Sequence, residues 1–237
     1  TAVKSFDTFE KARDAYRRTC RQWMADLTAI KVKTPDTAMD LMVNRWLLYQ
    51  TKASRILGRA GFYQAGGAIG FRDQLQDMLA LIWTDPGYIR DHILDCAAHQ
   101  FESGDVQHWW HPPLRGVRTR ITDDLLFLPY VTADYVEHTG DTGILFEEVN
   151  YLKDVAIPEG QEDWYGVAEQ AVLREPLYQH CLQALHRAAK AGAHGLPLIG
   201  TGDWNDAMNS VGDEGKGESV WLGWFLTNTQ RRFAETL

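Results

Sequence analysis

The chain has 237 residues, of which 45 % are hydrophobic, and its formal net charge at pH 7 is −8. This composition is sufficient for a folded core and excludes an intrinsically disordered chain. The acidic balance, without any run of lysine or arginine, excludes nucleic acid as the expected partner.

Seven segments carry apolar residues at helical spacing. In chain order they cover residues 7–30, 36–58 (or 36–61), 71–83, 87–102, 122–140, 175–192 and 217–237. Asp36 is a predicted N-cap, Pro176 lies in a predicted first turn and Gly140 is a predicted stop. Strands are not expected, apart from a short one in "YLKDVAIP" at most. The sequence therefore predicts an all-α chain built from helical hairpins.

Targeting and redox signals are weak in this sequence. The N-terminal segment "TAVKSFDTFEKARDAYRR" has no apolar signal core, and no stretch of about 18 apolar residues occurs. The three cysteines, Cys20, Cys96 and Cys181, are far apart and form no CxxC pair. We therefore expect no disulfide framework, a reducing compartment, and thus a cytoplasmic location without direct membrane contact. A larger, membrane-bound protein could still contain this chain.

The connections between the predicted helices are unusually rich in functional residue types. Three of them stand out, "YQAGGAIGF", "SGDVQHWWHPPLRGVRTRI" and "GLPLIGTGDWNDAMNSVGDEGKG". Long connections in a compact domain are usually functional or disordered. Because these contain tryptophan, histidine, arginine and aspartate, we favour a functional role.

The first candidate pair is Arg72 and Asp73, in "GFRDQLQD". An aspartate at a helix start can simply satisfy free amides and the helix dipole. Alternatively, both side chains face a pocket, where a carboxylate accepts from sugar hydroxyls and an arginine orients it. Both interpretations remain open at the level of sequence.

The second candidate group is the run "RGVRTRITDDLLFLPY". Three arginines, Arg115, Arg118 and Arg120, precede the adjacent pair Asp123–Asp124. A surface ion-pair cluster with an N-cap would explain part of this pattern. One cap needs only one aspartate, so the pattern favours a polar ligand site next to the tryptophans of "HWWH".

The third candidate is "TGDWNDAMN", in which Asp203 and Asp206 flank Trp204. Both aspartates can serve as turn or cap residues. In a cleft, Trp204 would offer an aromatic face to a sugar ring. Asp206 in an apolar, aromatic-lined site would remain protonated near neutral pH and act as a general acid, which glycosidic cleavage requires.

A metal site is not expected, because neither an HExxH motif nor a closely spaced ligand trio occurs. His108 and His111 flank the two tryptophans and could contact a polar ligand. The histidines on predicted helices are interpreted as structural.

Taken together, the three connections resemble the glycoside phosphorylases of glycoside hydrolase family 94. The resemblance is carried by "YQAGGAIGFRDQLQDMLAL", "GDVQHWWHPPLRGVRTRITDDLLFLPY" and "HGLPLIGTGDWNDAMNSVGDEGKGESVWLGWFL", in the order typical of the family. It covers nearly the whole chain. The segment "VNRWLLYQTKASRI" resembles in particular the phosphorylase-like domain of cyclic β-1,2-glucan synthase.

The resemblance implies a six-hairpin, (α/α)₆-barrel catalytic domain, of which residues 1–237 would form the first half to two-thirds. It also implies inverting phosphorolysis of a β-glucoside to α-glucose 1-phosphate and a shortened sugar. Inorganic phosphate is then the co-substrate and attacks the anomeric carbon itself, so neither a cofactor nor an enzymic base is needed. The expected partners are a β-glucan or oligosaccharide, phosphate, and the remainder of the domain or a larger synthase.

The roles implied by the resemblance fall on six residues. Asp206 matches the family's catalytic acid. The sugar-binding residues match Arg72, Asp73, Arg118, Asp124 and Trp204. The register leaves Asp123 open beside Asp124, and the other two arginines open beside Arg118.

Two observations limit this interpretation. The family usually has glycine where this chain has Ala207, and the residues that bind phosphate in the family follow later in the chain, so low activity is expected of these 237 residues alone. The alternatives are an inverting hydrolase, which would need a second carboxylate as base, and a non-catalytic carbohydrate-binding module. The sequence leaves the glucan linkage and length open.

Overall fold

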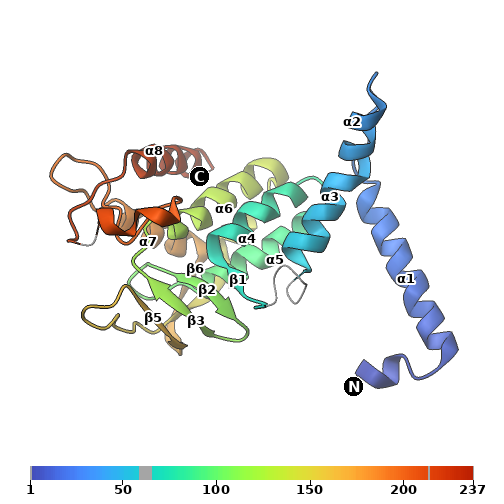
Figure 1. Cartoon of the computed structure of the whole chain (residues 1–237), viewed down its shortest axis with the longest axis horizontal. Coiled ribbons are helices and arrows are strands. Elements are labelled where there is room, and N and C mark those ends of the chain that lie inside the picture. Colours follow the sequence, from blue (N-terminus) through green and yellow to red (C-terminus); the bar gives the residue numbers. More distant parts are fainter. Residues whose placement is uncertain (1, 59–65, 213, 237) are drawn as a thin grey trace.

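A computed structural model describes residues 2–58, 66–212 and 214–236 of the chain. The elements, in chain order, are η1 (Ala2–Ser5), α1 (Phe9–Leu27), α2 (Thr37–Leu41), η2 (Met42–Trp46), α3 (Leu47–Gln50), η3 (Thr51–Ile56), β1 (Ile69–Gly70), α4 (Phe71–Met78), η4 (Leu79–Leu81), α5 (Pro86–Ala97), β2 (Gln107–His111), β3 (Arg115–Thr119), η5 (Asp124–Leu126), α6 (Phe127–Thr139), η6 (Thr142–Phe146), β4 (Glu148–Leu152), β5 (Asp163–Val167), β6 (Gln170–Pro176), α7 (Leu177–Ala188), η7 (Asp206–Val211) and α8 (Val220–Glu235). Figure 1 shows how these elements are arranged.

Each of the seven predicted helical segments contains a helix. The predicted punctuation is also present: the Asp36 carboxylate accepts from the amides of residues 38 and 39, and Gly140 ends α6 in the left-handed region with φ 71°. The second segment runs as one helical stretch from Thr37 to Ile56, with two π-helical parts. Its alternative end, Gly61, lies outside the described residues.

Helix α6 is the centre of the apolar core. It packs against α4, α5, α7 and α8, and its buried side chains include Leu128, Val131 and Val136. Helix α4 buries Phe71, Leu75 and Met78, which are spaced by four and three residues and therefore share one face. This packing holds the first turn of α4 close to the start of α6, where the candidate site lies.

The expectation of an all-α chain, and with it the (α/α)₆ barrel, is wrong. The described residues form two antiparallel sheets, one of four strands in the order β1-β2-β3-β5 and one made of β4 and β6. Two strands of the first sheet, β2 and β3, lie within residues 103–121, a connection that we expected to be a loop (Figure 1). In it, Trp109 pairs with Val117 and Trp110 with Gly116.

Strands β2 and β3 were missed because some of their buried positions carry polar residues, whereas β4 overlaps the one short strand that the sequence allowed. Gln107 in β2 and Arg118 in β3 are both buried, so the sequence shows no alternation of apolar and polar residues. Tertiary partners satisfy both side chains: Gln107 contacts His99 and donates to the Leu114 carbonyl, and Arg118 binds Asp105. Pattern reading cannot anticipate a strand whose inward face is polar.

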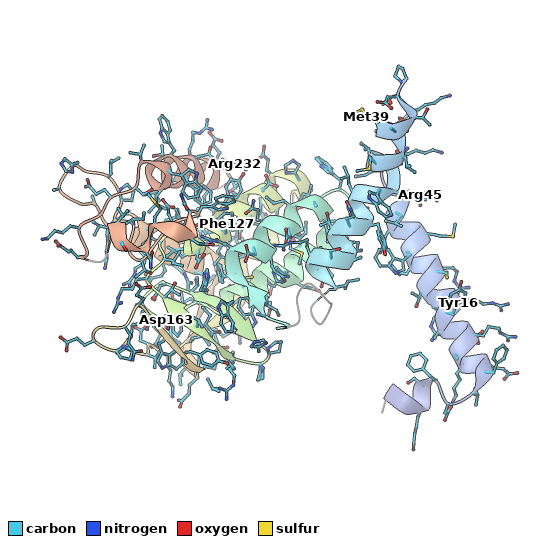
Figure 2. All side chains as sticks on the ribbon, viewed as in Figure 1. Tyr16, Met39, Arg45, Phe127, Asp163 and Arg232 are labelled. Atoms are coloured by element: carbon cyan, nitrogen blue, oxygen red, sulfur yellow. The ribbon has the colours of Figure 1, made fainter. Side chains whose placement is uncertain are left out.

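The N-terminal helix α1 meets the other elements only near its C-terminal end, where Trp23 contacts Tyr49 and Asp26 pairs with Lys52, and its N-terminal part extends away from them (Figure 1). It buries no residue, and Figure 2 shows Tyr16 projecting away from the body of the molecule. Among the described residues, no helix has the length and apolar character that crossing a membrane requires.

Candidate active site

Arg72 lies in the first turn of α4 and joins three separate parts of the chain. Its Nη1 donates to both carboxylate oxygens of Asp123, at 2.9 and 3.0 Å, and to the backbone carbonyl of Asp203 at 3.0 Å. Its Nη2 donates to Asp206 Oδ1, and its Nε lies 3.5 Å from Asp124 Oδ1. One buried guanidinium therefore connects the second and third candidate motifs. We call Arg72, Asp123, Asp124 and Asp206 the Arg72 cluster.

Burial separates the carboxylates of the Arg72 cluster into two kinds. The side chains of Asp123 and Asp124 are 0 % and 1 % exposed, whereas that of Asp206 is 70 % exposed. Asp206 is therefore the carboxylate that a ligand can reach directly. The described residues do not enclose it in the apolar surroundings that the sequence suggested for a neutral acid.

The buried carboxylates shift one another and their cations. Burial raises the pKa of Asp123 to about 8, and the charge of Asp124 acts in the same direction, against Arg72. Burial alone would lower the pKa of Arg72, but Asp123, Asp124 and Asp206 raise it above its ordinary value. Arg72 thus stays charged at any accessible pH.

His108, on β2, extends the cluster. Its Nδ1 lies 2.6 Å from Asp124 Oδ2. Burial would lower the pKa of His108, but the hydrogen bond and charge of Asp124 outweigh burial and raise it. Among the described residues, Asp124 Oδ1 has no hydrogen bond. The negative charge of Asp124 is therefore balanced by His108 and by Arg72, whose Nε lies 3.5 Å away.

The loop before η7 is held by Asp203, which the sequence could equally assign to a turn. Ser219 Oγ donates to Asp203 Oδ2 at 2.6 Å, and the Asn205 amide donates to Asp203 Oδ1 at 2.8 Å. Ser219 also accepts from the Leu222 amide and so caps α8. Sequence reasoning missed Ser219, and its only signal was its position ahead of an apolar helix.

Trp204 projects from this loop and is 53 % exposed. Its Nε1 lies 3.5 Å from Gln76 Oε1 on α4. Trp204, Met208 and Trp221 line a groove of about 710 Å³ next to the Asp206 loop. The indole is therefore free to stack against a flat apolar ligand face.

Besides Trp204, the predicted site residues Arg118 and Asp73 lie outside the Arg72 cluster. Arg118 binds Asp105 through two N–H donors, at 2.7 and 2.6 Å, and also contacts Asp154 at 3.0 Å. Asp73 is exposed in the first turn of α4, so close to Gly70 that a Cβ there would lie 2.6 Å from Asp73 Oδ2. For Asp73 this geometry favours the helix-dipole role.

One group of side chains among the described residues has the spacing of metal ligands. The ligand atoms of Asp134, Glu137 and His138 lie within 4.8 Å of one another. Arg232 Nη2 already contacts both carboxylates at 2.6 Å, so an arginine supplies the positive charge there.

The Arg72 cluster thus places one exposed carboxylate, Asp206, two residues from the exposed indole of Trp204, at the edge of a groove. Comparison with known proteins identifies the family to which the chain belongs. The profile of the Glycosyl hydrolase 94 superfamily, catalytic domain, matches residues 22–237, and the chain belongs to this family.

Individual relatives agree with this assignment. The chain is 48 % identical over 230 residues to the cyclic beta-(1,2)-glucan synthase NdvB of Rhizobium meliloti (strain 1021), covering 96 % of the chain and 8 % of the relative. It is 30 % identical over 225 residues to the solabiose phosphorylase of Paenibacillus borealis (94 % and 26 %). It is 25 % identical over 236 residues to the N,N'-diacetylchitobiose phosphorylase of Vibrio furnissii (87 % and 27 %). The chain thus spans between 8 % and 27 % of the length of these relatives.

Proposed function

We propose that this chain forms part of the catalytic domain of an inverting glycoside phosphorylase acting on β-glucans or β-gluco-oligosaccharides. The reaction transfers a glucosyl group to inorganic phosphate and gives α-glucose 1-phosphate and a shortened sugar. The observation that carries the proposal is the position of Asp206, which is exposed, bonded to buried Arg72 and two residues from the exposed Trp204. The phosphorylase names of several relatives support the reaction type.

In this mechanism Asp206 donates a proton to the departing glycosidic oxygen, because an unprotonated alkoxide is a poor leaving group. Phosphate attacks the anomeric carbon from the opposite face, so the C–O bond to the leaving sugar breaks as the C–O bond to phosphate forms. Arg72 contacts the carboxylate form of Asp206, so proton donation requires this ion pair to be released as the sugar binds; Asp123 and Asp124 hold Arg72 in place. Trp204 supports the sugar ring.

The sugar-binding roles of Asp73, Arg118 and Asp124 remain part of the proposal. In the structure Arg118 contacts Asp105 and Asp154, and Asp124 lies beneath Arg72. Direct contact of Arg118 or Asp124 with a sugar therefore requires the ligand to replace present partners. Within a longer synthase, the same activity would control glucan length. The cytoplasm remains the location that we predict for this chain.

The test measures glucose 1-phosphate after incubation with phosphate and a panel of β-1,2- and β-1,4-glucans. It is run on this chain and on a longer polypeptide that contains it, because the relatives are several times longer. We expect phosphate-dependent release that Asp206→Asn lowers by about 10²–10⁴-fold, the usual contribution of a general acid. The matched control is Asp91→Asn, an exposed aspartate on α5.

The outcomes separate the alternatives. Release of free sugar without phosphate would identify a hydrolase instead. Sugar binding that persists without turnover, and that Asp206→Asn leaves unchanged, would identify a carbohydrate-binding module.

A further inference from the structure

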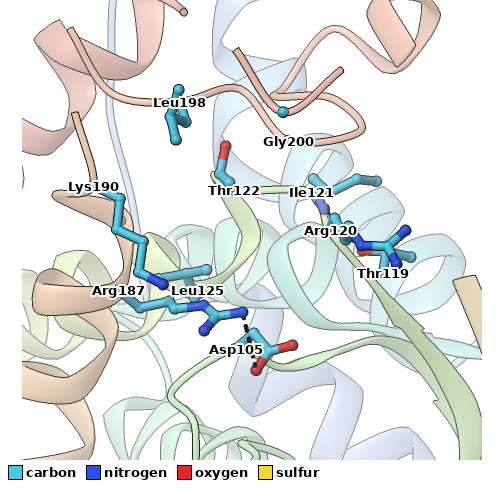
Figure 3. Close-up of a pocket in the computed structure, with 12 residues that line it drawn as sticks. Asp105, Thr119, Arg120, Ile121, Thr122, Leu125, Arg187, Lys190, Leu198 and Gly200 are labelled. Carbon is cyan, nitrogen blue, oxygen red and sulfur yellow. Dashed lines mark hydrogen bonds and ion pairs between the residues drawn. The ribbon is translucent and has the colours of Figure 1, made fainter. Parts of the chain in front are cut away.

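Three basic side chains surround a cavity of about 160 Å³ whose lining includes no member of the Arg72 cluster. Arg120 follows β3, Arg187 lies in the last turn of α7, and Lys190 follows that helix. Figure 3 shows Arg187 and Lys190 on one side of the cavity and Arg120 with Thr119 on the other. Segments far apart in the sequence thus bring their charges to one place.

Among the described residues that line the cavity, Asp105 carries the only carboxylate, and it is already paired. Both of its oxygens accept from Arg118, at 2.7 and 2.6 Å, and Ser103 Oγ donates to it at 2.6 Å. Burial would raise the pKa of Asp105, but Arg118 outweighs burial and holds it below its ordinary value. Arg118 also contacts Asp154 at 3.0 Å, and Arg187 lies 4.0 Å from Asp105, so Asp105 and Asp154 together balance Arg118 and Arg187.

The remaining cations are not balanced. Within the described part of the chain, the ion pairs do not include Lys190 or Arg120, and Arg187 approaches only Asp105, at 4.0 Å. Arg120 Nη1 donates to the Gln161 carbonyl, which is neutral, at 2.6 Å. Among the described residues, two of the three basic side chains that line the cavity, Arg120 and Lys190, thus have no ion-pair partner, in a chain whose net charge is −8.

The surroundings of the cavity strengthen these charges. Ile121, Leu125 and Leu198 form apolar walls, and charges interact more strongly where water is partly excluded. Thr119 Oγ1 accepts from the Ile121 amide at 3.2 Å, which leaves its hydroxyl hydrogen to donate. A second cavity, of about 230 Å³, shares Asp105, Thr119, Arg120 and Arg187 with the first and extends the polar space.

We propose that this cavity binds a phosphate group, held by Arg187 and Lys190 on one side and by Arg120 on the other. Guanidinium groups match the geometry of phosphate oxygens, and lysine adds a point charge. The ligand is either inorganic phosphate or the phosphate monoester of a sugar. The site is separate from Asp206, so it can exist whether or not the proposed phosphorolysis takes place.

The experiment is calorimetric titration of the 237-residue chain with inorganic phosphate and, separately, with glucose 1-phosphate, at ionic strength matched with chloride. The variant Arg187→Gln/Lys190→Gln removes two cations, of which Arg187 is half-buried and Lys190 is exposed. The control Arg17→Gln/Arg231→Gln removes two exposed arginines on α1 and α8. Circular dichroism checks that each variant is folded, and Lys190→Glu repeats the test at the more exposed position.

We expect the double variant to weaken phosphate binding by about tenfold or more, as the loss of two charge-assisted contacts implies, and the control by less than about twofold. If inorganic phosphate binds more tightly than glucose 1-phosphate, the ligand is free phosphate. If glucose 1-phosphate binds more tightly, the ligand is a sugar phosphate. Equal weakening by test and control variants, or no binding beyond that of chloride, would overturn the proposal.

Discussion

Arg72 is the residue on which the candidate site depends. Its side chain is 7 % exposed, and its ion partners lie at the start of η5 (Asp123 and Asp124) and at the start of η7 (Asp206). Burying two adjacent carboxyl groups costs free energy, which a close cation and the protonation of Asp123 near neutral pH offset. The guanidinium therefore both permits the Asp123–Asp124 pair and positions Asp206.

Replacing Arg72 should consequently destabilise the fold. We expect Arg72→Gln to lower the free energy of unfolding by about 3–5 kcal/mol, because it leaves buried carboxylates without their cation. Urea denaturation measures this change. The control Arg55→Gln removes a half-exposed ion pair with Asp77, and about 0–1 kcal/mol is expected. Similar losses in both variants would refute this account of Arg72.

The histidines divide by environment, and the division predicts a pH response. Burial lowers the pKa of both His99 and His180 to about 4. Because this lies below the ordinary value of 6.5, the unfolded state binds more protons, and stability falls as the pH drops from 6.5 toward 4. Each group contributes about 3 kcal/mol over that window. The pKa of His108 changes in the opposite direction, because its contact with Asp124 raises it.

Nuclear magnetic resonance titration of the imidazole groups tests this division directly. We expect His99 and His180 to remain neutral at pH 5.5 and His108 to titrate above 6.5. Titration of either buried histidine near 6.5, or of His108 below that value, would contradict the structure.

At the scale of elements, one serine joins helix α8 to the Asp206 loop. Ser219 caps the helix and also donates to Asp203, whose backbone carbonyl accepts from Arg72. The geometry of the loop is therefore coupled to a helix start. Gly200 closes the same loop where a Cβ would lie 1.8 Å from the Arg120 carbonyl, so no other residue fits there without movement.

Ser219→Ala should remove both functions of this serine. We expect a loss of about 2–3 kcal/mol in the free energy of unfolding, combining a lost N-cap with a buried carboxylate that lacks one partner. Thermal and urea unfolding measure it, with Ser210→Ala, an exposed serine in η7, as the control. A loss below that of a simple cap would show that Asp203 does not need Ser219.

At the scale of the whole molecule, the part of the N-terminal helix that precedes residue 22 is separable from the core. Helix α1 buries no residue, and the family match begins at residue 22. The ion pair of Asp26 with Lys52, at 2.8 Å, lies beyond that point.

Deletion of residues 1–20 should therefore leave the fold intact. We expect the free energy of unfolding to change by less than about 1 kcal/mol, because little surface is buried by this segment. Denaturation with urea compares the two chains, and a matched slope confirms that the same core unfolds. A substantially smaller slope would show that α1 is part of the cooperative unit.

The sequence by itself determined the helices and the motifs. Apolar spacing, the Asp36 cap and the Gly140 stop are local signals, so they place helices without knowledge of their neighbours. The motifs around Arg72 and Asp206 likewise led to the family.

Only the tertiary structure decided the sheets and the partners. Gln107 and Arg118 occupy buried strand positions because His99 and Asp105 satisfy them there. These partners lie 8 and 13 residues away along the chain, outside the two-residue alternation by which a strand is recognised. The same reason explains why Arg72, 134 residues from Asp206, contacts it, whereas Arg118, six residues from Asp124, binds elsewhere. Spacing along a chain fixes which face a side chain takes, but the packing of helices and strands selects the charges that it meets.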